Sequence, residues 1–378
     1  MKVLVIGSGG RDHAIAWSFT RSSRVKQVYV AHGNGGIART ATCVNAKTVE
    51  EMAAFAESEK IDLTFVGPEK PLSSGIVDEF ERRGLPIIGP SQRASRLESS
   101  KCDTKLMLQE LGIPVPEFAV FSDPDDARSY VRQVGYPVVV KPADIGSSVG
   151  VCIAHDRQEF EEAVATVRRY SERVLVERYV KGLKEINISV LGDAEGLKLS
   201  VCEEPITASE FLTYQDKYAG GGSASGSKVA SADGPSASTA AASSTSGAAG
   251  TSSAGMQSAK RRIPAELPEE VRTTIEAYAR KAFETLDCSG VTRIDFILEP
   301  VDPNGRPEDF QCKQIYINEF NTIPGSLSFY LWEATGKPFP ELLDDLVELG
   351  LRKKRRRSKL TFTHDINILA TGSFGVKK

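Results

Sequence analysis

The chain has 378 residues, of which 40% are hydrophobic and 26% are charged, and its formal net charge at pH 7 is −3. These values are ordinary for a soluble globular protein of two or three domains, and the charge gives no general signature of nucleic-acid or membrane binding. The six cysteines are scattered without a C-x-x-C pair, which argues against a zinc site or a disulfide framework. No apolar run approaches the length of a membrane span. We therefore expect a cytoplasmic α/β protein.

The first hundred residues alternate between apolar runs and segments with helical spacing. Residues 3–6 form an apolar run, G-S-G-G follows at 7–10, and residues 12–20 have helical spacing. A glycine turn between a strand and a helix favours binding of a phosphate. The dinucleotide-binding fingerprint is incomplete, however, because Asp12 stands at its third glycine position. Further strands at 27–31, 61–66 and 85–88, with helices at 49–58 and 73–83, predict a parallel sheet of about four strands ending near residue 90.

Motifs in this region resemble the amino-terminal domain of glycinamide ribonucleotide synthetase. They read G-S-G-G-R-D-H-A, H-G-N-G-G-I-A, V-G-P-E-K-P-L-S-S-G-I-V-D and G-P-S-Q-R-A-S-R-L-E-S-S-K, and the likeness covers residues 1 to about 105. The resemblance implies that the glycine loop helps to hold a phosphoribosylamine. Asp12 departs from the glutamate that this family usually has, and the alternative is that the glycines only turn the chain.

The middle of the chain carries a pattern of residues suited to binding phosphates. A predicted helix at 100–111 places Lys101 and Lys105 one turn apart. The strand V-V-V-K ends at Lys141 and runs into P-A-D-I-G-S-S-V-G-V, so a lysine, exposed N–H groups and the hydroxyls of Ser147 and Ser148 share one hairpin. The G-K-[ST] ending of a Walker loop is absent, so a P-loop fold is not expected.

The next strands add candidate contacts for the rest of a nucleotide. A predicted strand at 175–177 ends at Glu177, which could meet an adenine edge. Glu185, on the strand that follows, could accept hydrogen bonds from ribose hydroxyls.

Polar side chains lie on two predicted strands in the last third of the chain. The segment I-Y-I-N-E-F-N-T-I-P-G at 315–325 begins as a strand, and Glu319 and Asn321 leave the same face of it. Asp295, in V-T-R-I-D-F-I-L at 291–298, could supply another oxygen from a neighbouring strand. Carboxylate and amide oxygens are hard ligands suited to Mg²⁺ that carries nucleotide phosphates. The alternative is an ordinary strand pair with polar residues facing water.

From residue 138 onward the sequence resembles D-alanine–D-alanine ligase. The motifs include K-P-A-D-I-G-S-S-V-G-V, V-L-V-E-R-Y-V-K-G, E-F-L-T-Y-Q-D-K-Y, C-S-G-V-T-R-I-D-F and I-N-E-F-N-T-I-P-G-S-L. Both resemblances belong to the ATP-grasp ligases. The implied fold class is therefore α/β, with an ATP-grasp fold that follows a parallel, doubly wound amino-terminal domain.

The two resemblances imply a division into five parts. These are an amino-terminal domain at 1–100, an ATP-grasp central and small subdomain at 101–218, an insertion at 219–258, a catalytic subdomain at 259–352 and a basic tail at 353–378. The insertion consists almost entirely of Ser, Ala, Gly and Thr, so its composition predicts disorder, and the resemblance places it in the lid over the reaction centre. The run K-K-R-R-R-S-K at 353–359 favours a solvated helix end over a nucleic-acid-binding segment.

The ligase resemblance also implies roles for single residues. Two Mg²⁺ ions, for which Mn²⁺ could substitute, would be held by Asp295, Glu319 and Asn321. ATP would be bound by Lys101, Lys141, Ser147, Ser148, Glu177, the backbone near Val180, and Glu185. Catalysis would rest on Arg293 and the N–H of Gly325 at the oxyanion, on Ser147 in the lid, and on Lys217 and Tyr218 in the closing loop. The spacing from Glu177 to Glu185 is one residue longer than in typical ligases.

The implied function is ATP-dependent joining of a carboxylate to an amine through an acyl phosphate, closest to D-alanine–D-alanine ligase. These ligases usually have a serine that contacts the second substrate where this chain has Tyr330, so the substrates are left open. One alternative is phosphoribosylamine–glycine ligase, and another is a catalytically silent nucleotide-binding sensor. The expected partners are a small-molecule carboxylate and amine, with no nucleic acid and no membrane, and a homodimer is left open.

Overall fold

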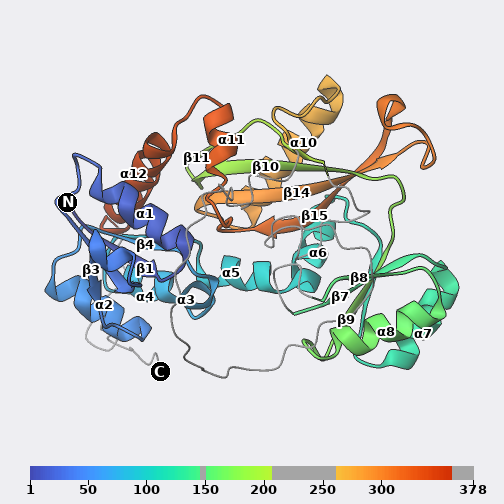
Figure 1. Ribbon diagram of the computed structural model, residues 1–378, viewed down its shortest axis with the longest axis horizontal. Coiled ribbons are helices and arrows are strands. Elements are labelled where there is room, and N and C mark those ends of the chain that lie inside the picture. Colours follow the sequence, from blue (N-terminus) through green and yellow to red (C-terminus); the bar gives the residue numbers. More distant parts are fainter. Residues whose placement is uncertain (145–149, 207–260, 360–378) are drawn as a thin grey trace, which may run out of the picture.

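The computed structural model describes residues 1–144, 150–206 and 261–359, and it is a mixed α/β structure (Figure 1). A parallel sheet lies at one end and two four-stranded antiparallel sheets at the other, with α5 (Gln92–Ser99) and α6 (Lys101–Glu110) between them; a third antiparallel sheet consists of two short strands. The predicted fold class, α/β with a parallel amino-terminal sheet, is therefore confirmed. Within the described ranges, no helix combines the length and the apolar character that crossing a bilayer requires.

The amino-terminal sheet is parallel throughout and has the strand order β3-β2-β1-β4-β5. Its strands are β1 (Lys2–Gly7), β2 (Gln27–His32), β3 (Thr42–Val44), β4 (Leu63–Val66) and β5 (Ile87–Ile88). The prediction of about four strands missed β3, which is only three residues long and carries no run of apolar residues. Strands β1 and β4 are almost wholly buried, because helices cover both faces of a parallel sheet.

The helices around this sheet follow the predicted alternation, with one exception. They are α1 (Gly10–Thr20), the 3₁₀ turn η1 (Ile37–Arg39), α2 (Val49–Ser58), α3 (Glu69–Ser73) and α4 (Ile76–Arg82). The predicted single helix at 73–83 is wrong, because Gly75 has a left-handed backbone with φ of 90° and separates α3 from α4. Glycine adopts that conformation without steric strain, so it interrupts the helix here.

The smaller antiparallel sheet has the order β6-β9-β7-β8 and packs against two helices. Its elements are β6 (Phe118–Phe121), α7 (Pro124–Val134), β7 (Val138–Pro142), β8 (Cys152–Ala154), α8 (Arg157–Val167) and β9 (Val174–Arg178). Val131 on α7 and Phe160 on α8 share one core with Val140 and Val176 of the central strands.

The larger antiparallel sheet has the order β11-β10-β14-β15. The elements of this region are β10 (Lys184–Asp193), β11 (Gly196–Leu199), β12 (Glu204–Pro205), β13 (Arg261–Arg262), α10 (Glu269–Thr285), β14 (Gly290–Pro300), η3 (Pro307–Asp309), β15 (Cys312–Asn321) and α11 (Phe329–Ala334). One face of the sheet is apolar: Ile188, Ile294 and Phe296 share a core with Ala279 and Phe283 of α10. The opposite face is polar and forms the candidate site.

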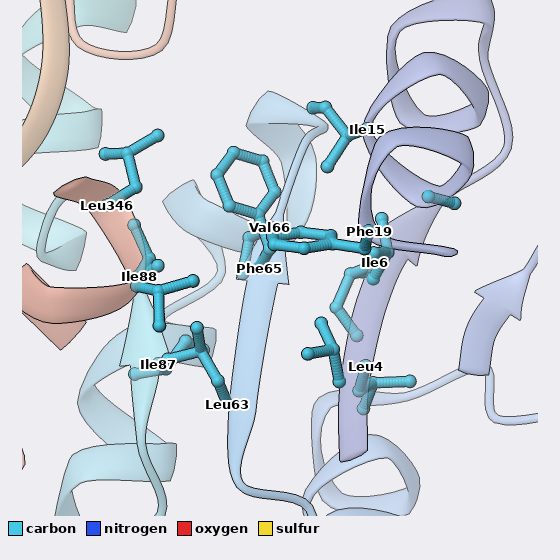
Figure 2. Packing of buried hydrophobic residues seen from close by; sticks show 14 of the residues in the cluster. Leu4, Ile6, Ile15, Phe19, Leu63, Phe65, Val66, Ile87, Ile88 and Leu346 are labelled. Atoms are coloured by element: carbon cyan, nitrogen blue, oxygen red, sulfur yellow. The ribbon is translucent and has the colours of Figure 1, made fainter. Parts of the chain in front are cut away.

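Helix α12 (Phe339–Arg357) follows the larger sheet in the sequence but packs on the first one. Leu342 and Leu346 belong to the core of the amino-terminal sheet, and Figure 2 shows Leu346 beside Ile88. Gly350 lies so close to this core that a Cβ atom there would come within 2.7 Å of Leu63. The carboxyl-terminal helix and the first hundred residues therefore form one packed unit.

The basic residues at the end of α12 are ion-paired. Lys353 and Arg357, one turn apart, both contact Glu81, at 2.5 and 3.0 Å. Arg356 pairs with Glu195 at 3.2 Å. The prediction of a solvated helix end is confirmed for Lys354, Arg355 and Lys359, which are exposed, whereas the Lys353 side chain is only 17% exposed. The expected boundary between 352 and 353 falls inside α12, while the division into five parts otherwise stays a prediction.

Candidate active site

Strand β15 carries the residues on which the metal hypothesis rests. Ile317 is buried in the core on the α10 side, and strict alternation from it would also turn Glu319 and Asn321 toward that core. Instead, Phe320 is the buried residue, at 3% exposure, and Glu319 and Asn321 lie on the opposite face. The strand therefore changes its facing just before Glu319.

A β-bulge at Asn318 causes this change. Asp295 on β14 lies opposite Glu319, whereas Phe296, the next residue, lies opposite Ile317. Asn318 is thus an extra residue on β15, and an extra residue reverses the facing of everything that follows it. The bulge keeps the apolar residues in the core and places Asp295 and Glu319 side by side on the polar face.

Three polar side chains form a connected set on β14 and β15. Arg293 donates two hydrogen bonds to Asp295, at 2.6 and 2.7 Å, and Asn321 donates to the same carboxylate at 3.3 Å. Arg293 also lies directly opposite Asn321 in the strand register. In the part of the chain that the structure describes, no group of three or more His, Cys, Asp or Glu side chains could hold a metal, so a cation here would also need the amide oxygen of Asn321.

The turn after β15 joins the two ends of the molecule. Gly325 is exposed, and a Cβ atom added there would meet nothing within 4 Å. Thr322 donates its hydroxyl to Glu98 on α5, and Arg11 on α1 donates to the carbonyl of Ile323 at 3.4 Å. Burial raises the pKa of Glu98 to about 8, although the hydrogen bond from Thr322 opposes the shift. Helices α1 and α5 thereby hold the turn that carries Gly325.

At the other end of the polar face, two lysines surround one glutamate. Lys105 lies 2.6 Å from Glu177, and Lys141 forms an ion pair with the second oxygen of the same carboxylate. All three side chains are at most 5% exposed. Burial alone would raise the pKa of Glu177, but the two ammonium groups outweigh burial and hold that pKa at about 2.

Helix α6 connects the two ends of the site. Lys101 Nζ lies 3.8 Å from Glu319 on β15, and Lys105, one turn later, reaches Glu177 on β9. The helix begins beside the end of β7, because the N–H of Lys101 donates to the carbonyl of Ala143 at 3.0 Å. One face of α6 therefore places one lysine beside Glu319 and another beside Glu177.

The remaining predicted nucleotide contacts flank this arrangement. Val180 follows β9 and is buried at 3% exposure. On β10, Ile186 is in the core, so its neighbours Glu185 and Asn187 face the other way. Asn187 lies opposite Asp295 in the register, which puts Glu185 on the same polar face.

Tyr330 is held in a separate buried cluster beside the site. Its hydroxyl donates to Glu203 at 3.0 Å, and the Arg261 guanidinium lies 4.6 Å from the centre of its ring. Glu203 also accepts from Asn187 at 3.1 Å and pairs with Arg261 at 3.2 Å. Burial raises the pKa of Tyr330, and the neighbouring carboxylate of Glu203 adds to the shift. The Tyr330 hydroxyl therefore donates its hydrogen bond to Glu203 within the protein.

The glycine turn at 7–10 packs against the side chain of Asp12, a residue of helix α1. The N–H of Gly9 donates to the Asp12 carboxylate at 2.9 Å, and Asp12 is only 4% exposed. A Cβ atom on Gly7 or on Gly67 would clash with this carboxylate. Burial raises the pKa of Asp12 against the hydrogen bond from Gly9. An anionic ligand at this turn would have to share it with a buried carboxyl group.

Several predicted site residues lie outside the described residues. They are Ser147, Ser148, Lys217 and Tyr218, and the Ser/Ala/Gly insertion at 219–258 lies there as well.

Three residues of the arrangement were not assigned from the sequence. Lys105 has a readable signal, because it sits four positions after Lys101 on the same helix face. Glu98 and Asn318 have none: the partner of Glu98 is far away in the chain, and the bulge at Asn318 depends on pairing with β14.

The fold and this polar face define the class of the protein, which is ATP-grasp. Residues 107–245 and 251–348 match the family model described as D-ala D-ala ligase C-terminus, and residues 1–98 match that of the phosphoribosylglycinamide synthetase N domain. The first match covers more than half of the chain, and the chain therefore belongs to the D-alanine–D-alanine ligase family.

Single relatives reflect both parts of the sequence. The D-alanine–D-alanine ligase of Acetivibrio thermocellus is 32% identical over 327 residues, which are 82% of this chain and 73% of that protein. The phosphoribosylamine–glycine ligase of Halalkalibacterium halodurans is 42% identical over 190 residues, which are 48% of this chain and only 44% of that protein. The chain thus spans less than half of the length of this relative.

A comparison of structures gives the fold of nearly the whole chain. The D-alanine–D-alanine ligase of Bacillus anthracis superposes with a TM-score of 0.64 at 22% identity, covering 94% of this chain and 99% of that one. The amino-terminal sheet is included in this coverage, although its sequence is closer to the other family.

Proposed function

We propose that the protein is an ATP-dependent ligase that joins a carboxylate to an amine through an acyl phosphate, releasing ADP and phosphate. The observation that carries the proposal is the continuous polar face between two sheets. It has Asp295, Glu319 and Asn321 at one end and Lys141 with Glu177 at the other, and α6 spans both. A nucleotide needs this combination of oxygen donors for its metal and buried cations for its phosphates.

The donor set fits Mg²⁺, because two carboxylates and an amide on adjacent strands supply hard oxygen ligands. Asp295, Glu319 and Asn321 would hold two Mg²⁺ ions, with Mn²⁺ as a substitute. Bound there, the ions would neutralise the charge on the phosphates of ATP. In the structure the fork of Arg293 donates two hydrogen bonds to Asp295 and so orients its carboxylate.

Arg293 and Gly325 are suited to stabilise the oxyanion of the tetrahedral intermediate. Burial alone would lower the pKa of Arg293, but Asp295 raises it, so the guanidinium stays charged in its low-dielectric surroundings. Gly325 offers an N–H group beside open space. A fixed cation and a backbone donor aimed at developing charge supply much of the catalysis in acyl transfer.

The substrates are a small-molecule carboxylate and amine, with two D-alanine molecules as the first pair to consider. A relative that matches 82% of this chain carries the name D-alanine–D-alanine ligase. We further propose a cytoplasmic protein that binds no nucleic acid and forms a homodimer.

Phosphoribosylamine–glycine ligation is the second candidate. It is favoured by the match of residues 1–98 to the phosphoribosylglycinamide synthetase N domain and by the relative that is 42% identical. Both reactions join a carboxylate to an amine at the expense of ATP, so the polar face is compatible with either.

The test is ADP release from ATP and Mg²⁺ across pairs of amino acids, with phosphoribosylamine plus glycine in parallel. ADP release that requires D-alanine, with a dipeptide detected by mass spectrometry, is the expected result. Turnover with phosphoribosylamine alone would replace it by the second candidate. Tight ATP binding without turnover of any pair would contradict both and indicate a nucleotide sensor.

A further inference from the structure

Lys105 is a buried cation that the proposed chemistry does not use. Its side chain is 3% exposed and lies 2.6 Å from Glu177, with the Phe118 ring centre 5.7 Å from its Nζ. Burial lowers the pKa of Lys105, and Glu177 opposes that shift. Because this side chain is isolated from water and lies against Glu177, we expect its role to depend on that carboxylate.

Glu177 is shared between two lysines that differ in their surroundings. Lys105 approaches one oxygen of the carboxylate from α6, and Lys141 approaches the other from the end of β7. Lys141 also donates to the side chain of Asn318 at 3.4 Å, on the bulge next to Glu319. Lys141 therefore lies between Glu177, the proposed adenine contact, and the neighbourhood of Glu319, a proposed metal ligand. Lys105 lies beside Glu177.

We infer that Lys105 is a positioning residue that carries the counter-charge of Glu177, so that Lys141 can leave Glu177 for the phosphates of the nucleotide. This inference rests on the proposed function. It assigns the buried triad a net positive charge that a bound anion would balance.

The physical reason is the cost of an unpaired charge in a buried place. If Lys141 were the sole partner of Glu177, moving it to a phosphate would leave a carboxylate buried without compensation, which is strongly unfavourable. With Lys105 in place, Glu177 stays ionised and fixed while Lys141 changes partners. One glutamate can then accept hydrogen bonds from an adenine amino group in both arrangements.

The test separates binding of the phosphates of the nucleotide from binding of its adenine base. Binding of MgATP, tripolyphosphate and adenosine to the full chain is measured by calorimetry, before and after Lys105→Met. We expect MgATP and tripolyphosphate to bind at least about tenfold more weakly, because Glu177 then retains Lys141. Adenosine binding should change by less than about twofold, because Glu177 keeps one cation. Lys26→Met, which removes an exposed lysine of the amino-terminal region, is the matched control.

The double variant Lys105→Met/Glu177→Gln provides a rescue. A neutral glutamine releases Lys141, so tripolyphosphate affinity should return to within about threefold of the unaltered protein. Glu177→Gln alone, which leaves both lysines in place, should bind tripolyphosphate more tightly, and it tests the inference even if Lys105→Met does not fold.

Three results would overturn the inference. Equal weakening of MgATP and adenosine by Lys105→Met would show a merely structural role, as would failure of the double variant to recover. Weaker tripolyphosphate binding by Glu177→Gln would contradict the charge argument. Absence of MgATP binding by the unaltered protein would instead overturn the proposed function, and the inference with it.

Discussion

Strand β1 buries side chains on both of its faces, whereas β15 buries one face and presents polar groups on the other. The parallel sheet around β1 is covered by helices on both sides, and its core extends to α12 (Figure 2). The antiparallel sheet around β14 and β15 has α10 on one side only. The first sheet therefore has little room for chemistry, and the second has a face that its own core does not use.

This difference predicts how each region responds to substitution. A change in the first sheet should lower the stability of the protein and leave the activity of the folded fraction intact. A change on the polar face of the second sheet should do the reverse, because exposed and half-buried polar residues contribute little to the core.

The largest effect is expected for Glu319→Ala. Turnover should fall by about a thousandfold, because a ligand to the proposed metal is lost, while the melting temperature shifts by less than about 2 °C. Steady-state ADP release and scanning calorimetry measure the two quantities. Lys313→Ala changes an exposed residue of the same strand and is the control. Activity that survives Glu319→Ala would show that the metal assignment is wrong.

Leu346→Ala tests the opposite half of the comparison. Removing this fully buried side chain should lower the free energy of unfolding by about 2–5 kcal/mol, with kcat unchanged. Denaturant titration measures the first quantity. The control is Glu341→Ala on the exposed side of α12, for which we expect less than about 0.5 kcal/mol. A loss of kcat without a loss of stability would mean that α12 belongs to the site.

Glu98→Gln tests the contact between the two regions through the pH dependence of stability. The pKa of Glu98 is raised from 4.5 to about 8 in the folded protein. Between these values the folded state keeps a proton that the unfolded state has released, so stability falls as the pH rises. Glutamine has no such proton to lose. The variant should therefore match the unaltered protein below pH 4.5 and be more stable above pH 8 by a few degrees in Tm. Parallel curves at every pH would contradict the shift.

The smallest effect is expected for Lys353→Ala at the end of α12. Glu81 keeps Arg357 as a partner, so the loss should be about 0.5–1 kcal/mol and should shrink at high salt. Lys354→Ala, at an exposed neighbouring position, is the control for removing one positive charge. An unchanged salt dependence would show that the pair with Glu81 contributes nothing.

Much of the first sheet could be predicted from sequence, because a strand buried on both faces is a continuous apolar run and needs no knowledge of its neighbours. The failures there have local causes. Strand β3 is too short to give a pattern, and Gly75 interrupts a helix that the apolar spacing alone would continue.

The candidate site was predictable as a set of residue types but not as an arrangement. Asp295, Glu319 and Asn321 could be proposed because they are oxygen donors on neighbouring predicted strands and lie in motifs that resemble the ligase family. The spacing of Glu319 and Asn321 gives their common facing, but which face of the sheet they occupy could not be derived, since alternation from Ile317 gives the wrong face. The ion pair of Lys105 with Glu177 was equally out of reach, because it joins residues on different elements.

The sequence by itself determined the fold class, the family and the chemical types gathered at the site, because these depend on periodicity and on short motifs. Only the tertiary structure decided which faces those residues share and which charges neutralise each other. The bulge at Asn318 exists through the pairing of β15 with β14, and the charge of Glu177 is balanced by lysines from α6 and β7. Both effects arise from contacts between segments distant in the chain, and no local pattern encodes them.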